Sequence, residues 1–248
     1  SEHTSILGFL VVNIFHKNGV PVDALELILG DGLYGDLLSK LNNINGIAFT
    51  GSLQTAKKIQ TNLNDSQKEI LPLIAETGGI NAMIVDSSAL LEQATDDIVR
   101  SAFDSAGQRC SALRVLCIQD DIYDDLLEMI KGNMRELKIG NPEKLDTDIG
   151  PIINQTAKDK LEAYIATKIK AGFAIYQSSL DSMEQHISPT IIEIDSLNDL
   201  KEEQFGPILH VLKFKSSEID NLIQDINNTG YGDRKSTRLN SSHQIISY

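Results

Sequence analysis

The sequence predicts an α/β fold with a largely parallel sheet. Helical and strand-like segments alternate along the first two-thirds of the chain, which is the pattern of helices that connect parallel strands. The strand candidates are short, continuous apolar runs, as expected for strands that are buried on both faces. The chain has 248 residues, 41% of them hydrophobic, and is therefore long enough to bury a sizeable core.

Segments with apolar residues three and four positions apart are predicted to be helices. In chain order they are residues 4–17, 33–41, 53–64, 90–103, 121–137, 156–171 and 217–227. The first ends at Asn18 and Gly19, and the fifth ends before Gly140, because these residue types stop helices.

Short apolar runs bounded by turn residues are predicted to be strands. In chain order they are residues 24–29, 44–49, 71–75, 82–85, 113–118, 190–194 and 208–214. The first ends at the turn sequence Gly30-Asp31-Gly32. The last residues, from Asp233 to Tyr248, are polar, serine-rich and aperiodic, so we expect them to lie outside the same fold.

Charge and composition exclude several classes of function. The 35 acidic and 22 basic residues give a net charge of −13, which argues against binding nucleic acid or an anionic membrane. The two cysteines, Cys110 and Cys117, match no common zinc motif, and so few thiols indicate a reducing compartment. The most apolar early stretch has about ten residues, too few to span a bilayer. We expect an acidic, cytoplasmic protein without a metal site or a membrane span.

Two segments are candidates for binding a ligand. Gly51 and Ser52 lie between a predicted strand and a predicted helix, where free backbone N–H groups favour a phosphate. The same arrangement is typical of an ordinary helix cap, and the dinucleotide fingerprint with three spaced glycines is absent. Residues 202–207, which include Glu203 and Phe205, are either a helix-to-strand turn or a ligand-contact loop.

Cys110 and Glu76 are the candidates for chemistry. Cys110 follows Arg109, whose charge would favour a nucleophilic thiolate; the alternative is a small buried hydrophobe. Cys117 lies within an apolar run and fits that alternative better. Glu76 precedes two glycines that allow close backbone packing, so that its partly desolvated carboxylate would act as a general base. An exposed loop acid is the alternative for Glu76.

Four motifs, in order, resemble the aldehyde dehydrogenase superfamily. They are Phe-Thr-Gly-Ser at 49–52, Glu-Thr-Gly-Gly at 76–79, Gly-Gln-Arg-Cys at 107–110 and Glu-Glu-Gln-Phe-Gly-Pro at 202–207. Residues 75–89 and 101–115 most resemble the L-glutamate γ-semialdehyde (pyrroline-5-carboxylate) dehydrogenase module of bifunctional bacterial proline utilization enzymes. The resemblance implies a partial aldehyde dehydrogenase fold, with part of a Rossmann-like cofactor domain and most of an α/β catalytic domain.

The resemblance also implies a reaction. Cys110 would attack the aldehyde as a thiolate, and a thioester would remain on Cys110 after hydride transfer to NAD. Glu76 would then activate the water that hydrolyses this thioester. The Cys110 backbone N–H would form part of the oxyanion hole, and Ser111 would help hold the substrate carboxylate.

The cofactor contacts implied by the resemblance lie elsewhere in the chain. Gly51 and Ser52 would bind the pyrophosphate of NAD, Glu203 the nicotinamide ribose, and Phe205 the nicotinamide side of the pocket. Glu2 falls where a family acid meets the adenosine ribose.

The same resemblance implies a domain organisation. Residues 1–77 would be the C-terminal half of the NAD-binding domain and residues 78–232 the catalytic domain. Residues 233–248 would be a tail foreign to the family, disordered or artefactual, that resembles a translated sequencing adapter. We therefore expect a fragment cut at both ends, inactive or nearly so when isolated.

The whole protein would act on a small-molecule aldehyde and form a homo-oligomer, with a fusion to a proline dehydrogenase domain left open. Two other functions also stay open: a non-catalytic aldehyde-dehydrogenase-like interaction module, and a dehydrogenase for a different aldehyde.

Overall fold

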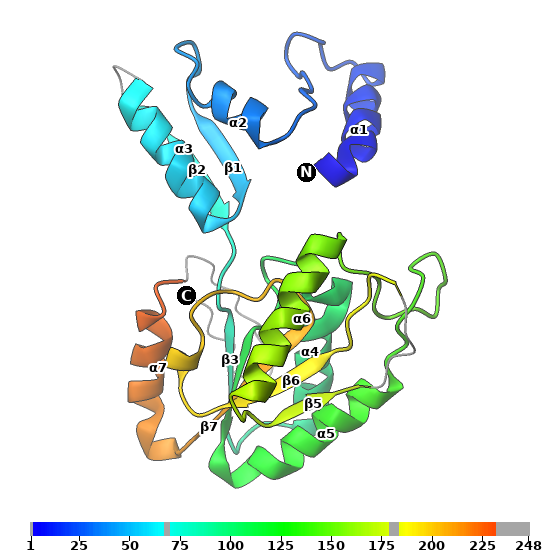
Figure 1. Ribbon diagram of the computed structural model, residues 1–248, viewed down its shortest axis with the longest axis vertical. Coiled ribbons are helices and arrows are strands. Elements are labelled where there is room, and N and C mark those ends of the chain that lie inside the picture. Colours follow the sequence, from blue (N-terminus) through cyan, green and yellow to red (C-terminus); the bar gives the residue numbers. More distant parts are fainter. Residues whose placement is uncertain (1, 67–69, 179–183, 232–248) are drawn as a thin grey trace. The chain divides into compact units, whose positions relative to one another are not determined.

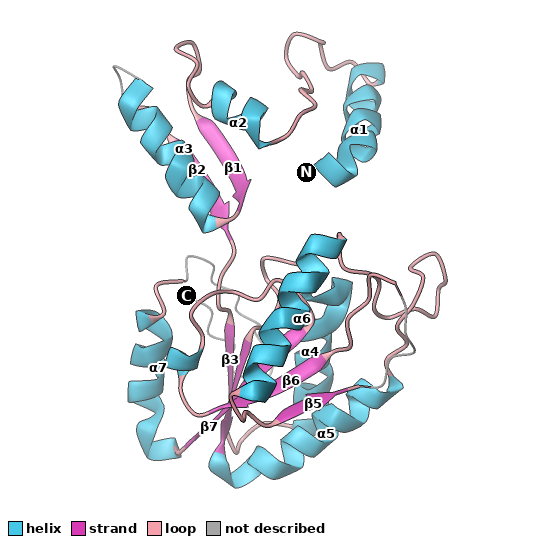
Figure 2. Cartoon of the chain, in the orientation of Figure 1, coloured by secondary structure: helices cyan, strands magenta, loops and turns pink. Residues whose placement is uncertain are grey.

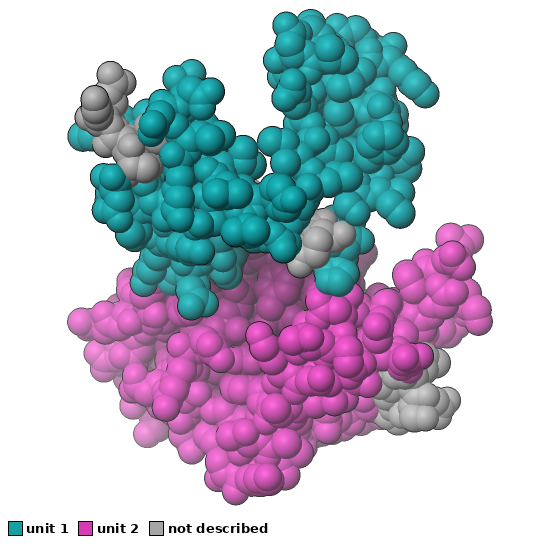
Figure 3. Space-filling view, turned by 45° about the horizontal axis from the view of Figure 1, so that its top comes forward, with its two compact units in different colours: residues 1–77 teal, residues 78–248 magenta. Residues whose placement is uncertain are grey.

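The computed structural model describes residues 2–66, 70–178 and 184–231. The chain forms two compact units, residues 1–77 and residues 78–248, which are coloured separately in Figure 3. The tail expected at residues 233–248 lies outside the described residues.

Unit 1 contains a two-stranded parallel sheet with helices before and between its strands (Figure 1). Its elements are the 3-10 turn η1 (Glu2–Thr4), α1 (Ser5–Lys17), α2 (Gly32–Leu38), β1 (Ile47–Gly51), α3 (Leu53–Ser66) and β2 (Leu73–Thr77). In the sheet Ile47 lies opposite Leu73, and Gly51 lies opposite Thr77. The predicted strand–helix–strand order from residue 44 to residue 75 is thereby confirmed.

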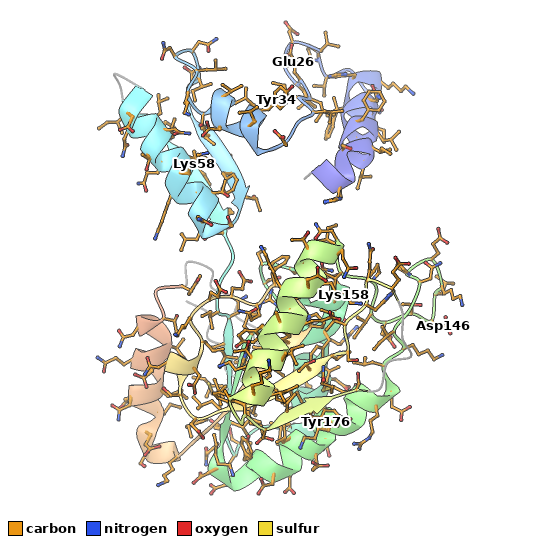
Figure 4. The ribbon with its side chains drawn as sticks, in the orientation of Figure 1. Glu26, Tyr34, Lys58, Asp146, Lys158 and Tyr176 are labelled. Atoms are coloured by element: carbon orange, nitrogen blue, oxygen red, sulfur yellow. The ribbon has the colours of Figure 1, made fainter. Side chains whose placement is uncertain are left out.

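The Asp36 carboxylate links α2 to α3. It accepts hydrogen bonds from Lys40 at 2.6 Å and from Asn62 of α3 at 3.0 Å. Lys58 of α3, labelled in Figure 4, forms an ion pair with it at 3.0 Å. These donors, Lys40 foremost, hold the pKa of the Asp36 carboxyl well below its usual range. The short helix α2 is therefore fixed to α3 by polar contacts.

The strand predicted at residues 24–29 is wrong. This segment has no strand conformation, and its residues Leu27, Ile28 and Leu29 are exposed. A strand needs a neighbouring strand to satisfy its backbone N–H and C=O groups. In the described part of unit 1, the pairing is between β1 and β2 alone. An apolar run signals a tendency toward burial but cannot supply a partner.

Unit 2 contains a five-stranded sheet in the order β3-β4-β7-β6-β5. Its strands are magenta in Figure 2. The strands are β3 (Ala82–Val85), β4 (Val115–Gln119), β5 (Ile175–Gln177), β6 (Thr190–Ile194) and β7 (Ile208–Phe214). The helices are α4 (Leu91–Phe103), α5 (Tyr123–Glu136), α6 (Gln155–Lys170) and α7 (Ile219–Asn228). The 3-10 turns are η2 (Asp104–Gly107), η3 (Asp120–Ile122), η4 (Leu197–Asp199) and η5 (Ser216–Glu218).

The sheet of unit 2 is largely parallel, as the sequence predicts. β3, β4, β7 and β6 run parallel to one another, and only the edge strand β5 is antiparallel to its neighbour β6. In Figure 1, α6 crosses in front of the sheet and α4 lies behind it. Every residue of β4 is buried, because helices cover both faces of a parallel sheet. The segment that carries Cys110 enters this buried strand directly.

Candidate active site

The segment between α4 and β4 makes a sharp turn before it reaches Cys110. Ser105, Ala106 and Gly107 have φ angles of 56°, 54° and 63°, a left-handed conformation that costs energy in residues other than glycine. A Cβ atom on Gly107 would collide with the Gly206 carbonyl oxygen. The turn therefore requires glycine at position 107 and brings residues 107–110 against the loop at 202–207.

Two side-chain amides anchor the segment that follows. Gln108 donates from Nε2 to the Pro151 carbonyl at 3.0 Å, and its Oε1 accepts from the Ile153 N–H at 2.8 Å. Asn81, just before β3, donates from Nδ2 to the Cys110 carbonyl and to the Ala112 carbonyl, both at 2.8 Å. The backbone at the predicted nucleophile is thus held from two directions.

The two cysteines lie in different environments. Cys110 is partly buried, and Ser111 beside it is exposed. Cys117 is fully buried in β4, and this burial raises the pKa of its thiol to about 12. A thiol that stays protonated is a poor nucleophile, so the structure supports Cys110 and not Cys117 as the reactive residue.

A buried ion pair lies next to the Cys110 segment. The Arg114 side chain is 2% exposed and donates to Glu203 Oε1 from Nη2 at 3.0 Å and from Nε at 3.2 Å. Burial lowers the pKa of Arg114, which the charge of Glu203 opposes. Burial likewise raises the pKa of Glu203, and the guanidinium and a hydrogen bond from the Gly79 backbone oppose that change. A Cβ on Gly78 would overlap Glu203 Oε2, so this glycine is required for the carboxylate to pack here.

Phe205 extends the same cluster toward the surface. The Arg114 guanidinium carbon lies 5.3 Å from the centre of the Phe205 ring, within range of a cation–π contact. The Phe205 side chain is 46% exposed. The residue is therefore open enough to solvent for a ligand group to contact it.

His210 of β7 is buried, and its backbone N–H donates to the Arg114 carbonyl at 2.9 Å. Its Nδ1 is 3.1 Å from the Arg114 carbonyl, which can only accept, so Nδ1 carries the proton. Its Nε2 then accepts from the Tyr164 hydroxyl of α6 at 2.9 Å. Burial foremost, together with the charges of Lys168 and Arg114, lowers the pKa of His210 to about 4, and the hydrogen bond to the Arg114 carbonyl opposes this change. The imidazole is therefore a neutral hydrogen-bonding bridge between α6, β7 and the start of β4.

The remaining predicted site residues belong to unit 1. Ser52 caps α3, because its Oγ accepts from the Thr55 N–H at 3.2 Å. Gly51 and Ser52 are exposed, and Glu76 lies within β2, also exposed, and not in the loop that its alternative interpretation supposed. Glu2 begins the turn η1, and its side chain lies outside the described part of the chain.

Within unit 2, the structure brings the Cys110 segment together with Glu203 and Phe205. Arg114 and Asn81, which make this possible, were not identified as site residues from the sequence. The sequence contains one signal for Arg114, because it is a single cation directly before an apolar strand. A charge at such a position is buried only when it is paired, so a charged partner elsewhere in the chain was to be expected.

Neither a metal cluster nor a membrane helix is found in the part of the chain that the structure describes. Residues 2–66, 70–178 and 184–231 contain no group of three or more His, Cys, Asp or Glu placed to hold a metal ion. None of the helices in these ranges has the length and apolar character needed to cross a bilayer.

Comparisons with known proteins give a consistent result. The model of the aldehyde dehydrogenase family matches residues 1–240. The bifunctional protein PutA of Klebsiella aerogenes is 44% identical over 94% of this chain, which spans 19% of that protein. A 1-pyrroline-5-carboxylate dehydrogenase of Oceanobacillus iheyensis is 33% identical over 94% of this chain, which spans 46% of that protein.

Solved structures agree with the sequence matches. A mutant of proline utilization A from Bradyrhizobium japonicum superposes with a TM-score of 0.91 at 43% identity, covering 94% of this chain and 24% of that one. A betaine aldehyde dehydrogenase from Staphylococcus aureus, in complex with NAD+ and with a modified cysteine, has a TM-score of 0.84 at 27% identity. The match covers 92% of this chain and 47% of that one. The chain belongs to the aldehyde dehydrogenase family.

Proposed function

We propose that this chain carries the catalytic cysteine of an NAD-dependent dehydrogenase that oxidises L-glutamate γ-semialdehyde to L-glutamate in proline catabolism. The observation that carries the proposal is the partly buried Cys110 on a backbone held by Asn81, Gln108 and Arg114. Relatives named 1-pyrroline-5-carboxylate dehydrogenase and PutA support the choice of substrate. The word "bifunctional" in the PutA name supports a second activity in the whole protein, predicted to be a proline dehydrogenase domain.

Cys110 performs the covalent steps in this proposal. Its thiolate attacks the aldehyde carbon and forms a C–S bond, and the Cys110 backbone N–H stabilises the oxygen anion that results. NAD, when bound, would supply the hydride acceptor, and loss of hydride from the adduct leaves a thioester on Cys110. Glu76 takes a proton from a water molecule, which attacks the thioester carbonyl. The C–S bond then breaks, and glutamate and the Cys110 thiolate are released. Ser111, exposed beside the thiol, donates to the substrate carboxylate.

The residues predicted to hold NAD fit its chemistry. α3 has 14 residues, and the N–H groups of its exposed first turn, together with the Ser52 hydroxyl, suit a pyrophosphate. Gly51 is required at this strand end because a Cβ there would collide with the Phe49 ring. In the other unit Glu203 offers a fixed carboxylate to ribose hydroxyls, and the exposed side chain of Phe205 suits a nicotinamide ring. Glu2 stays assigned to the adenosine ribose.

The first test of the proposal is protection of Cys110 from iodoacetamide. Because the aldehyde adds reversibly to the thiolate, glutamate semialdehyde should slow alkylation of Cys110, as followed by peptide mass spectrometry. Cys117 provides the internal control, since its buried thiol should stay unlabelled in the folded chain. Alkylation of Cys110 at an unchanged rate in the presence of the aldehyde would contradict the proposal.

The second test detects the thioester. A single covalent event on Cys110 is the readout, so that the test does not depend on turnover. Glu76→Gln should accumulate a glutamyl group on Cys110 when NAD and the aldehyde are both present, whereas Glu76→Gln combined with Cys110→Ser should accumulate none. Equal mass gain in both variants would exclude Cys110 as the nucleophile.

A further inference from the structure

The Arg114 side chain uses all its hydrogen-bonding capacity on two loops. Its Nη1 donates to the Gly107 carbonyl at 2.7 Å and to the Gly206 carbonyl at 3.1 Å. Its Nη2 donates to the Arg109 carbonyl at 3.2 Å, and Nη2 and Nε both donate to Glu203. A guanidinium has five N–H donors, so every one has an acceptor. The acceptors on Gly107 and Arg109 belong to the segment that leads to Cys110. The acceptors on Glu203 and Gly206 belong to the 202–207 loop.

The bond from Arg114 to the Arg109 carbonyl helps to set where the Cys110 N–H points. The Arg109 carbonyl and the Cys110 N–H belong to one planar trans peptide, in which the two groups point in opposite directions. Arg114 holds that carbonyl at 3.2 Å together with the Ala112 backbone N–H at 3.1 Å, so that the Cys110 N–H points away from the guanidinium. Asn81 holds the carbonyl of the next peptide, that of Cys110 itself, at 2.8 Å. The peptides on both sides of Cys110 are therefore fixed by side chains.

The same guanidinium also fixes Glu203. This carboxylate lies 89 positions further along the chain, and its other contacts are the Gly79 N–H and the backbone at Gly78. A lysine at position 114 would keep the charge opposite Glu203. It would not keep the planar fork that reaches Glu203 and three carbonyls together, because an ammonium has three donors on a single atom.

We propose that Arg114 is a positioning residue that orients the Cys110 N–H as an oxyanion donor and couples this orientation to the placement of Glu203. The inference rests on the proposed role of Cys110 as nucleophile. Arg114 itself touches neither the aldehyde nor the cofactor; it acts through the Arg109 peptide and the Glu203 carboxylate. A purely structural Arg114 would instead affect stability without favouring one Cys110 reaction over another.

Two reactions of Cys110 distinguish a positioning role of Arg114 from a purely structural one. With p-nitrophenyl acetate, the sulfur attacks the ester carbonyl, the carbonyl oxygen becomes an oxyanion, and p-nitrophenolate leaves as the C–O bond breaks, which leaves an acetyl thioester. With iodoacetamide, the sulfur displaces iodide in one step and no oxyanion forms. Only the first reaction needs a correctly oriented N–H donor. Both reactions can be followed in the full chain without NAD.

The variants to compare are Arg114→Met and Arg114→Lys. The acylation and alkylation rates are each measured at a pH high enough that raising it further no longer increases the rate. We expect both variants to lower the acylation rate roughly tenfold or more, since loss of a whole oxyanion donor costs about 10²–10³. Alkylation should change less than about threefold in Arg114→Lys, which keeps the charge near the sulfur. Lys168→Met is the matched control, because Lys168 is also a buried cation that donates to a backbone carbonyl, that of Asp199 at 2.9 Å.

The outcomes are distinguishable. A drop in acylation relative to alkylation in the Arg114 variants, absent from Lys168→Met, supports the inference. A parallel fall of both rates in a folded Arg114→Lys chain, checked by circular dichroism, overturns it, as does the same ratio change in Lys168→Met. If the parent chain releases no more p-nitrophenolate than Cys110→Ser, the proposed function has failed instead.

Discussion

Acidification should destabilise unit 2 through His210. Burial lowers the pKa of this imidazole to about 4 from an ordinary 6.5, so below pH 6.5 the unfolded chain binds a proton that the folded chain does not. Stability is therefore fully present above pH 6.5 and is lost as the pH falls toward 4. The two pKa values differ by roughly 2.5, and at about 1.36 kcal/mol for each unit of pKa the loss reaches about 3 kcal/mol.

The main structural reason for this loss is the burial of the imidazole, which leaves a charged ring without solvation. His210 Nε2 accepts from the Tyr164 hydroxyl at 2.9 Å, and on protonation this hydroxyl has to reverse its role and accept from Nε2. The new cation would also face Lys168 and Arg114, whose charges already disfavour it. Desolvation of a charged ring at 2% exposure is the largest contribution.

The assay is urea unfolding between pH 7 and pH 4, followed by circular dichroism because the chain contains no Trp. The control is His210→Asn, which keeps a donor near the Nδ1 position but does not titrate. Carboxylates titrate in both chains, so subtracting the variant's free energy of unfolding from that of the parent isolates the imidazole. The difference should shrink by about 3 kcal/mol on acidification. Equal pH dependence in the two chains, or a parent that gains stability relative to the variant at low pH, would refute the reasoning.

Two substitutions test the packing around the site. Gly107→Ala should destabilise the chain by roughly 2 kcal/mol or more, since alanine must adopt a positive φ and its Cβ would collide with the Gly206 carbonyl; a change below about 0.5 kcal/mol in urea unfolding would contradict the turn geometry. Leu116→Ala, in the fully buried strand β4, should cost about 2–5 kcal/mol; a surface-like change in the same assay would contradict the position of β4 inside the sheet.

The elements of unit 2 were predictable because their sequences are unambiguous. β3, β6 and β7 span the predicted residues 82–85, 190–194 and 208–214, and the run predicted at 113–118 is strand β4 at Val115–Gln119, with small shifts of its ends. The three-residue strand β5 was not predicted, since Ile175–Gln177 is too short to show a period. Residues 24–29 look like a strand from composition, and only the absence of a pairing partner among the described residues reveals that they are not.

The candidate site was predictable as a set of residues but not as an arrangement. Cys110, Glu203 and Phe205 follow from motifs, whereas the side chains that hold them do not. Arg114 contacts Glu203 across 89 positions and Gly206 across 92, and one sequence contains no signal for such pairs. His210 gives an equally weak signal, since a histidine in an apolar run looks the same whether it bridges two elements or faces solvent.

The long reach of Arg114 also has a consequence for synthesis of the chain on the ribosome. Cys110 emerges well before Glu203 and Gly206, and a nascent chain that ends within α6 contains the thiol but neither of these partners of Arg114. Until β7 has been made, the Arg114 carbonyl also lacks its bond to the His210 N–H, 96 positions away. The oriented form of the Cys110 N–H is therefore expected only late in translation, which limits attack of the Cys110 sulfur on carbonyl compounds in incomplete chains.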